Sequence, residues 1–180
     1  MARTKGKPAE GFDSIAQETD RVPRVAFERE RGVVGVSGET GYYHVAAMTG
    51  GGDDRMAHEL TVFNALSDAG VSLTMIKYHA HSVSFVMRAM HHEKAVAVIK
   101  KLGFGCRSEG PMGILNVHAS DMRELSGVML KTSEALMSVG APIVQLGDSH
   151  RALYVLMPES RLADAIAATR EVFGVGGPVE

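Results

Sequence analysis

The stretch VFNALSDAGVSLTMIKYHAHSVSFVM, residues 62–87, changes its hydrophobic period within one compact run. Its first part continues a helical spacing of apolar residues, which predicts a helix over 56–69. Gly70 is expected to end this helix, because glycine adopts the left-handed conformation without a Cβ clash. Residues 71–76 and 83–87 then alternate apolar with polar side chains on either side of a short polar turn. That order predicts a helix followed by a β-hairpin.

The same order of elements returns later in the chain. Residues 126–139 have helical spacing and are followed by Gly140, and the runs 142–147 and 152–157 have the character of two hairpin strands. The copies can be overlaid as NALSDAGVSLTMI on EALMSVGAPIVQL, with an Ala-Leu pair ahead of the glycine in both. A repeat of about seventy residues has the size of a duplicated small α+β domain.

Additional elements complete the two copies. They are predicted strands at 33–37, 42–48, 104–108 and 113–119, a turn at 38–41, a linker at 109–111, and helices at 94–102 and 159–173. Each copy then has the order β-α-β-β-α-β, except that the second lacks its last strand, because its C-terminal end is short and rich in glycine. The strand near 33–37 is expected to complete that second sheet.

The sequence therefore predicts an α+β fold of two ferredoxin-like βαββαβ units, with the first inserted in the second. The predicted domains are a tail or linker at 1–31, a first unit at 41–109, a second unit at 32–40 plus 110–174, and a tail at 175–180.

Composition limits the classes of partner and the compartment. The 180 residues are 45% hydrophobic and carry a formal net charge of −2, which gives no electrostatic case for nucleic acid or an anionic membrane surface. Arg3, Lys5 and Lys7 make only the extreme N-terminus basic. No apolar stretch has the length of a membrane span, and the single cysteine, Cys106, fits a reducing compartment. The expectation is a cytoplasmic protein.

The loop Gly50–Asp54 is the best candidate site in the sequence. Glycines let a ligand approach the backbone, and the free N–H groups at the start of a helix bind anions such as carboxylates. A flexible connection capped by an aspartate is an equally open interpretation. His79, His81, His91 and His92 lack the spacing of a closed zinc site, so no metal or cofactor is expected. Cys106 is expected to be a core residue, and no catalytic residue is assigned.

Three segments carry a resemblance to a known family: Val33–Val36, Val62–Leu66 continuing through Gly70–Ile76, and Gly140–Ile143 with Asp148–His150. Together they resemble the paired ACT domains in the regulatory region of aspartate kinases, over about residues 32–173. The resemblance implies that such pairs dimerise and that an amino acid, typically lysine or threonine, binds at the interface between ACT units. The kinase catalytic domain is not expected within this sequence.

The resemblance also implies where the ligand binds. Asp54 matches the aspartate of the family's Asp-x-Pro-Gly loop, but Met56 and Ala57 stand where proline and glycine are usual. Other departures fall on the ligand segments while core positions match, which indicates either a different ligand or a copy without ligand binding. The candidate ligand-binding residues are Gly51, Gly52, Asp53, Asp54, Arg55, Thr74, Tyr78, Pro142, Ile143, Ser149 and His150.

Three functional hypotheses follow. The first is a non-catalytic, homodimeric regulatory protein that binds an amino acid or similar small ligand at ACT–ACT interfaces and modulates a partner enzyme of amino-acid metabolism or its own assembly. The alternative is a ligand-free assembly or regulatory subunit of an amino-acid biosynthetic enzyme such as aspartate kinase. A third is a small enzyme of acylphosphatase type, but Asp53 and Asp54 would repel phosphate in the loop that this chemistry needs.

Overall fold

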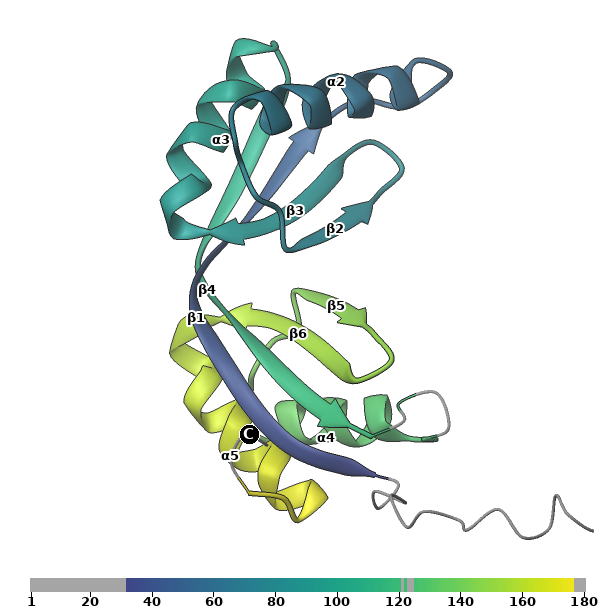
Figure 1. The fold of residues 1–180 in the computed structure, drawn as a ribbon, viewed down its shortest axis with the longest axis vertical. Helices are drawn as coiled ribbons and strands as arrows, with labels where there is room; N and C mark the ends of the chain where they lie inside the picture. The colour runs from purple at the N-terminus through teal and green to yellow at the C-terminus, as the bar shows by residue number, and fades with distance from the viewer. Residues whose placement is uncertain (1–31, 121, 123–124, 177–180) are drawn as a thin grey trace, which may run out of the picture. The chain divides into compact units, whose positions relative to one another are not determined.

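The computed structural model describes residues 32–120, 122 and 125–176, which form an α+β fold (Figure 1). This part of the chain contains a six-stranded antiparallel sheet with the order β2-β3-β1-β4-β6-β5 and four α-helices. The strands are β1 (Val33–Met48), β2 (Met75–Tyr78), β3 (Val83–Arg88), β4 (Gly105–Ala119), β5 (Gln145–Asp148) and β6 (Ala152–Pro158). The helices are α2 (Arg55–Asp68), α3 (Ala89–Lys101), α4 (Val128–Ser138) and α5 (Leu162–Phe173), with the 3-10 turn η3 (Glu159–Arg161) ahead of α5.

Two long strands, β1 and β4, run through the whole sheet and pair with each other. The residues 42–48 of β1 and 105–109 of β4 join β2 and β3 in what we call the first half, together with α2 and α3. The residues 33–39 of β1 and 112–119 of β4 join β5 and β6 in the second half, with α4 and α5. Val36, for example, pairs with Val117 in the second half.

The turn predicted at 38–41 and the linker predicted at 109–111 are both wrong. Each segment lies inside a continuous strand, because β1 and β4 lie side by side and supply each other's backbone hydrogen bonds. The glycines and the proline instead mark irregular pairing, with register shifts between Glu39 and Tyr42 and again before His44. The glycines and the proline therefore indicate a local irregularity of the strands, such as a β-bulge, rather than a turn.

The predicted helices and their glycine ends are present, with shifted bounds. All four helices end in the same way: in α2 the N–H of Gly70 donates to the carbonyl of Ser67 (2.8 Å) and that of Val71 to Leu66 (2.9 Å). The corresponding bonds in α4 run from Gly140 to Met137 and from Ala141 to Leu136. This is the Schellman motif, which the predicted glycine stops indicated.

The first strand of each hairpin is shorter than predicted. Strand β2 begins at Met75 rather than at Val71, and β5 begins at Gln145 rather than at Pro142. Val71 is nevertheless buried, because it packs on Leu66 as part of the helix end. Apolar alternation at 71–73 therefore reflects a packed connection and not a strand.

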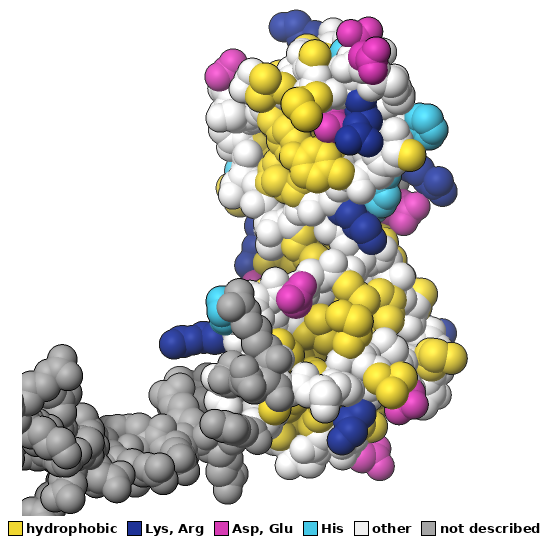
Figure 2. All heavy atoms as spheres, turned by 90° about the vertical axis from the view of Figure 1, so that its right-hand side faces the viewer, with side chains coloured by type: hydrophobic (Ala, Val, Ile, Leu, Met, Phe, Trp, Pro, Cys, Tyr) yellow, Lys and Arg dark blue, Asp and Glu magenta, His cyan; other side chains and the backbone are white. Residues whose placement is uncertain are grey.

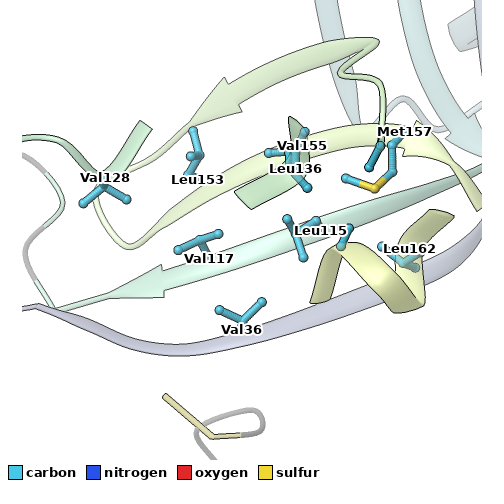
Figure 3. Close-up of a cluster of buried hydrophobic side chains, with 11 residues drawn as sticks. Val36, Leu115, Val117, Val128, Leu136, Leu153, Val155, Met157 and Leu162 are labelled. Atoms are coloured by element: carbon cyan, nitrogen blue, oxygen red, sulfur yellow. The ribbon is translucent and has the colours of Figure 1, made fainter. Parts of the chain in front are cut away.

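Each half has its own hydrophobic core between the sheet and its helices. In the first half, Val45, Phe85 and Val83 of the sheet pack against Leu66 of α2 and Ile99 of α3. The second core has the same construction (Figure 3) and contains Val36, Leu115, Val117, Leu136, Leu153, Val155, Met157 and Leu162. The opposite face of the sheet carries a smaller cluster of Tyr42, Val86, Met112, Ile114 and Leu156, which draws residues from both halves.

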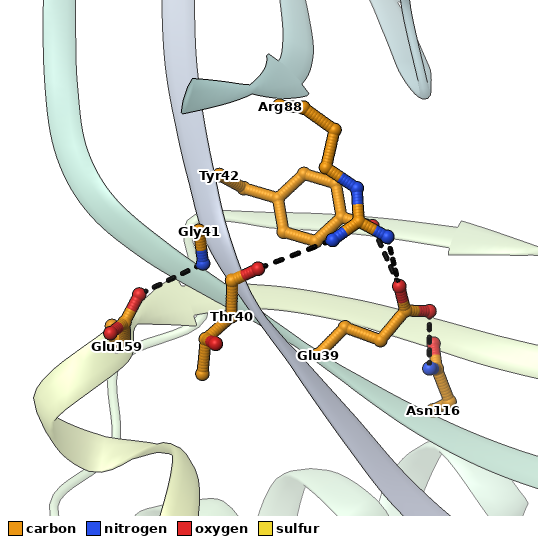
Figure 4. A network of polar contacts seen from close by, with 7 residues as sticks. All are labelled: Glu39, Thr40, Gly41, Tyr42, Arg88, Asn116 and Glu159. Atoms are coloured by element: carbon orange, nitrogen blue, oxygen red, sulfur yellow. Dashed lines mark hydrogen bonds and ion pairs between the residues drawn. The ribbon is translucent and has the colours of Figure 1, made fainter. Parts of the chain in front are cut away.

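A polar network also joins the two halves (Figure 4). Arg88, at the end of β3, pairs with the carboxylate of Glu39 at 2.6 Å and lies over the ring of Tyr42. Glu39 also accepts hydrogen bonds from the Tyr42 hydroxyl (2.8 Å) and from the Asn116 side chain (3.3 Å). The N–H of Gly41 donates to Glu159 of η3 at 3.0 Å. The network therefore connects first-half β3 with second-half β4 and η3.

The predicted N-terminal tail lies outside the described residues, and so do residues 177–180 of the predicted C-terminal tail. None of the helices in the described ranges is long and apolar enough to cross a membrane.

Candidate functional site

The glycine loop between β1 and α2 lies against the turn between β2 and β3. The N–H of Gly50 donates to the carbonyl of His81 at 3.1 Å, and the Arg55 guanidinium donates to the carbonyl of His79 at 3.4 Å. A Cβ on Gly51 would lie 2.6 Å from Nδ1 of His81, so the loop and the imidazole can approach this closely only because residue 51 is glycine. The structure thus brings the predicted loop to a turn rich in histidine.

The start of α2 leaves the two predicted carboxylates in solvent. Asp54 is the N-cap residue, as expected, but its side chain makes no capping hydrogen bond. Both Asp53 and Asp54 are exposed. Arg55, in the first turn of the helix, forms an ion pair with the buried Glu59 at 3.4 Å. The uncapped first turn has N–H groups that can donate hydrogen bonds to an anionic group of a ligand.

Thr74 and Tyr78 lie at the two ends of β2, an edge strand of the sheet. The N–H of Thr74 donates to Val86 at 2.8 Å just before the strand begins. The Tyr78 ring is 59% exposed and lies beside Phe63 of α2, with 6.1 Å between the ring centroids. Tyr78 is therefore on the side of the glycine loop, whereas Thr74 is at the far end of the strand.

The remaining predicted residues belong to the second half. Pro142 and Ile143 are exposed just before β5, the other edge strand, and Ser149 and His150 form the turn after it. The Ser149 hydroxyl accepts a hydrogen bond from the N–H of Ala152 at 3.1 Å. A depression of about 300 Å³ is lined by Met122, Asp148, Ser149 and His150. The predicted residues thus form two sets, one beside each edge strand.

A larger depression, of about 410 Å³, lies on the sheet face of the first half that the helices leave uncovered. Its residues come from three strands and from the β2–β3 turn: His44, Ala46, Met48, the turn 79–82, Ser84, Arg107 and Glu109. Sequence reasoning assigned no role to His44, Arg107 or Glu109. The alternation of His44, Ala46 and Met48 with the core residues Val45 and Ala47 is the signal that could have placed the first of these on this face.

Burial of the His44 ring lowers its pKa, because desolvation disfavours the charged imidazolium. The Glu109 carboxylate and a hydrogen bond with Gln145 oppose this decrease, whereas the positive charges of His79 and Lys77 reinforce it. His79 is itself hydrogen-bonded through Nε2 to the Ser84 hydroxyl at 3.0 Å.

Exposed hydrophobic side chains lie on the edge strands and on the helices that precede them. In the first half they are Met56 and Leu60 of α2 with Ile76 and Tyr78 of β2, and in the second half they are Met129, Leu130 and Met137 of α4 with Ile143 just before β5. Figure 2 shows hydrophobic side chains gathered on one side of both halves. Unpaired strand edges bordered by apolar surface are typical of protein–protein contacts.

Within the described ranges no cluster of His, Cys, Asp and Glu could hold a metal ion. Cys106, predicted to be a core residue, is half-buried on β4 and packs against the first-half core. Burial raises the pKa of its thiol, which disfavours the nucleophilic thiolate.

Comparison with known proteins places this fold. The chain has the fold of the regulatory subunits and regulatory domains of aspartate kinase. It is similar to the regulatory subunit of aspartate kinase from Thermus flavus, with a TM-score of 0.71 and 18% identity over 79% of this chain and 99% of that one. It is also similar to a putative C-terminal regulatory domain of aspartate kinase from Porphyromonas gingivalis, with a TM-score of 0.63 and 14% identity over 77% of this chain and 95% of that one.

Sequence comparison finds a relation over part of the chain. The chain is 25% identical to aspartokinase 1 of Bacillus subtilis over 112 residues, which are 62% of this chain and 28% of that protein. No family model matches the sequence. The sequence match is thus to an aspartokinase, and the two structural neighbours are regulatory parts of aspartate kinases.

Proposed function

We propose that this chain is a regulatory protein of amino-acid biosynthesis, which binds an amino acid or similar small ligand and modulates a partner enzyme or its own assembly. The observation that carries the proposal is the extent of the structural match. The match spans 99% of the Thermus flavus regulatory subunit, so it includes essentially that whole module. The sequence relation to aspartokinase 1 supports the same assignment.

The two halves would be two ACT units, the first at 41–109 and the second at 32–40 plus 110–174. Three features support this proposal. Each half contains four strand segments and two helices, and its sheet has an equivalent strand order. The helices α2 and α4 end in the same Schellman motif, just before β2 and β5 respectively. The segment 33–39 supplies the outer strand of the second unit, beside β4.

The ligand site would be completed by a second copy of the chain. One residue set, Gly51–Arg55 with Thr74 and Tyr78, lies beside edge strand β2, and the other, Pro142–Ile143 with Ser149–His150, lies beside edge strand β5. A homodimer in which these edges meet would bring the two sets together. The apolar side chains beside both edges supply surface that such contact would bury.

The first unit offers complementary chemistry for a zwitterion. The ligand carboxylate would be bound by the free N–H groups at the start of α2, where the helix dipole favours negative charge. The ligand ammonium would be bound by the exposed carboxylates of Asp53 and Asp54. Binding would shift the equilibrium of dimer formation or of association with the partner enzyme. The size of this shift is limited by the difference in the ligand's affinity for the associated and the dissociated states.

Calorimetric titration of wild-type protein with the L-amino acids tests the site through matched variants. Asp54→Ala is expected to weaken binding of the effective amino acid by about tenfold or more, because it removes a charge-assisted contact. Asp68→Ala is the control, since Asp68 is an exposed aspartate at the other end of the same helix. Equal affinity of the wild type and Asp54→Ala for the amino acid would show that the ligand does not bind at this loop.

The ligand-free assembly subunit is the other outcome of this experiment. Under that hypothesis no amino acid binds at millimolar concentration, while the protein still forms a dimer or a stable complex with an enzyme of amino-acid biosynthesis.

A further inference from the structure

We propose that the depression on the uncovered face of the first half is a separate binding site for a small anion that carries carboxylate or phosphate groups. It differs from the proposed amino-acid site, because its floor is the sheet face rather than the start of α2 or an edge strand. The two sites are adjacent at the turn 79–82, which lines the depression and is hydrogen-bonded to the glycine loop.

The floor of the depression is formed by small side chains. Strand pairing sets Ala46 between Ser84 on β3 and Arg107 on β4, and Ser84 in turn pairs with Lys77 on β2. Directly opposed residues of neighbouring strands present their side chains on the same face. The result is a row across the sheet with two short side chains at its centre and a cation at each end. The short side chains leave room for a ligand between the two cations.

The charges around this row favour an anion. Arg107 and Lys77 are positive, and the imidazole rings of His44, His79 and His81 add ring nitrogens that can donate hydrogen bonds. Glu109 is the carboxylate lining the depression, and it pairs with Arg107 at 3.4 Å in an exposed ion pair. The positive groups therefore outnumber the negative one, and an anion can replace solvent at the outer donors of the Arg107 guanidinium.

Two of the histidines are held in position. The hydrogen bond between Nε2 of His79 and the Ser84 hydroxyl fixes that ring over the floor. The ring of His81 lies against Gly51, where a Cβ would come within 2.6 Å of it. An anion bound here would therefore contact a turn that is hydrogen-bonded to the glycine loop, so that occupancy of one site can affect the other.

The test is an NMR titration of the full chain, in which histidine ring signals are followed as inorganic phosphate or succinate is added. We expect saturable shifts for His44, His79 and His81, and no saturable shift for His118, a second-half histidine that is hydrogen-bonded to Ser37 and belongs to neither proposed site. Saturation with phosphate alone or with succinate alone would identify which anionic group the site takes. Bound anion is also expected to raise the pKa of His44, because negative charge stabilises the imidazolium against the effects of Lys77 and His79.

Two variants separate the site from general charge effects. Arg107→Ala is expected to weaken the affinity by about tenfold or more, whereas Arg161→Ala, which removes another arginine from an exposed ion pair, is expected to leave it unchanged. Ala46→Leu should abolish binding without altering any charge, because it fills the floor, and its unfolding temperature would show that the fold is retained. Linear shifts of equal size at all histidines, or equal affinity in Arg107→Ala, would overturn the proposal. Arg107 and Ala46 belong to neither residue set of the proposed amino-acid site, so the effects of these two variants are independent of that site.

Discussion

Glu39 is the residue on which the contact between the two halves converges. It lies in the irregular part of β1 and interacts with Arg88, Tyr42 and Asn116. The hydrogen bond from Tyr42 is the largest cause that lowers the pKa of the Glu39 carboxyl. Conversely, burial and the neighbouring carboxylate raise the pKa of Tyr42 to about 12. The ionised carboxylate with a protonated tyrosine is therefore the stable form at neutral pH.

A double-mutant cycle of Glu39→Gln and Arg88→Gln should give a coupling free energy of about 0.5–1 kcal/mol at pH 7, because half-exposed ion pairs contribute little more than this.

The same carboxylate makes the stability depend on pH. Since the folded pKa of Glu39 is lowered, its ionisation stabilises the fold above the unfolded value near 4.5, and this stabilisation is lost as the pH falls through the folded value. Chemical denaturation of the four proteins of the cycle at pH 7 and at pH 3 measures the coupling free energy and its dependence on pH. The exposed pair Arg107 and Glu109, at 3.4 Å, is the matched control. A coupling that persists unchanged at pH 3 would contradict the assignment.

At the scale of the element, β1 and β4 are the strands that make one sheet out of two similar halves. Both continue through segments rich in glycine and, in β4, through Pro111. Gly41 has a φ of +80°, which L side chains adopt only with strain, and it lies in the irregular stretch of β1 where the halves meet. The unusual conformation of this single residue allows the strand to stay paired with β4 on both sides.

Replacing Gly41 with alanine is expected to destabilise the protein by about 1 kcal/mol or more, since the left-handed conformation costs an L residue about 1–2 kcal/mol. Gly32→Ala is the control, because Gly32 has no positive φ and a Cβ there would meet open space. The free energies of unfolding in urea give the comparison. Equal stability of the two variants would show that the bulge tolerates a side chain.

The elements that the sequence predicted well are those with a local cause. A glycine after an amphipathic run ends a helix wherever it occurs, so the stops at Gly70, Gly103 and Gly140 were predictable. The continuity of β1 was not, because Gly38-Glu39-Thr40-Gly41 has the composition of a turn and only the pairing with a distant strand keeps it extended. The uncovered sheet face was missed for the same reason, since it forms only when Arg107 pairs with Ala46 and Glu109 with His44, residues that are far apart in the sequence.

At the scale of the whole molecule, the predicted ligand residues occupy equivalent places in two halves rather than one cleft. The resemblance predicted these residues as one set, because it places the ligand at an interface between ACT units. In the strand order, β2 and β5 lie at opposite ends. The strands and helices that a single chain needs are all present, and the two halves share β1 and β4. Within one chain the two edge strands approach each other at Met75 of β2 and Gly147 of β5, where a Cβ on Gly147 would lie 2.9 Å from Cε of Met75.

The most direct test of the regulatory proposal is thermal unfolding of the wild-type chain in the presence of each L-amino acid at millimolar concentration. A ligand that binds only the folded state raises stability by mass action, by about 2.7 kcal/mol at one hundred times its Kd. The account predicts that one amino acid, or a few of related structure, raises the unfolding temperature in a concentration-dependent way while the others do not. An unchanged unfolding temperature with every amino acid would contradict it.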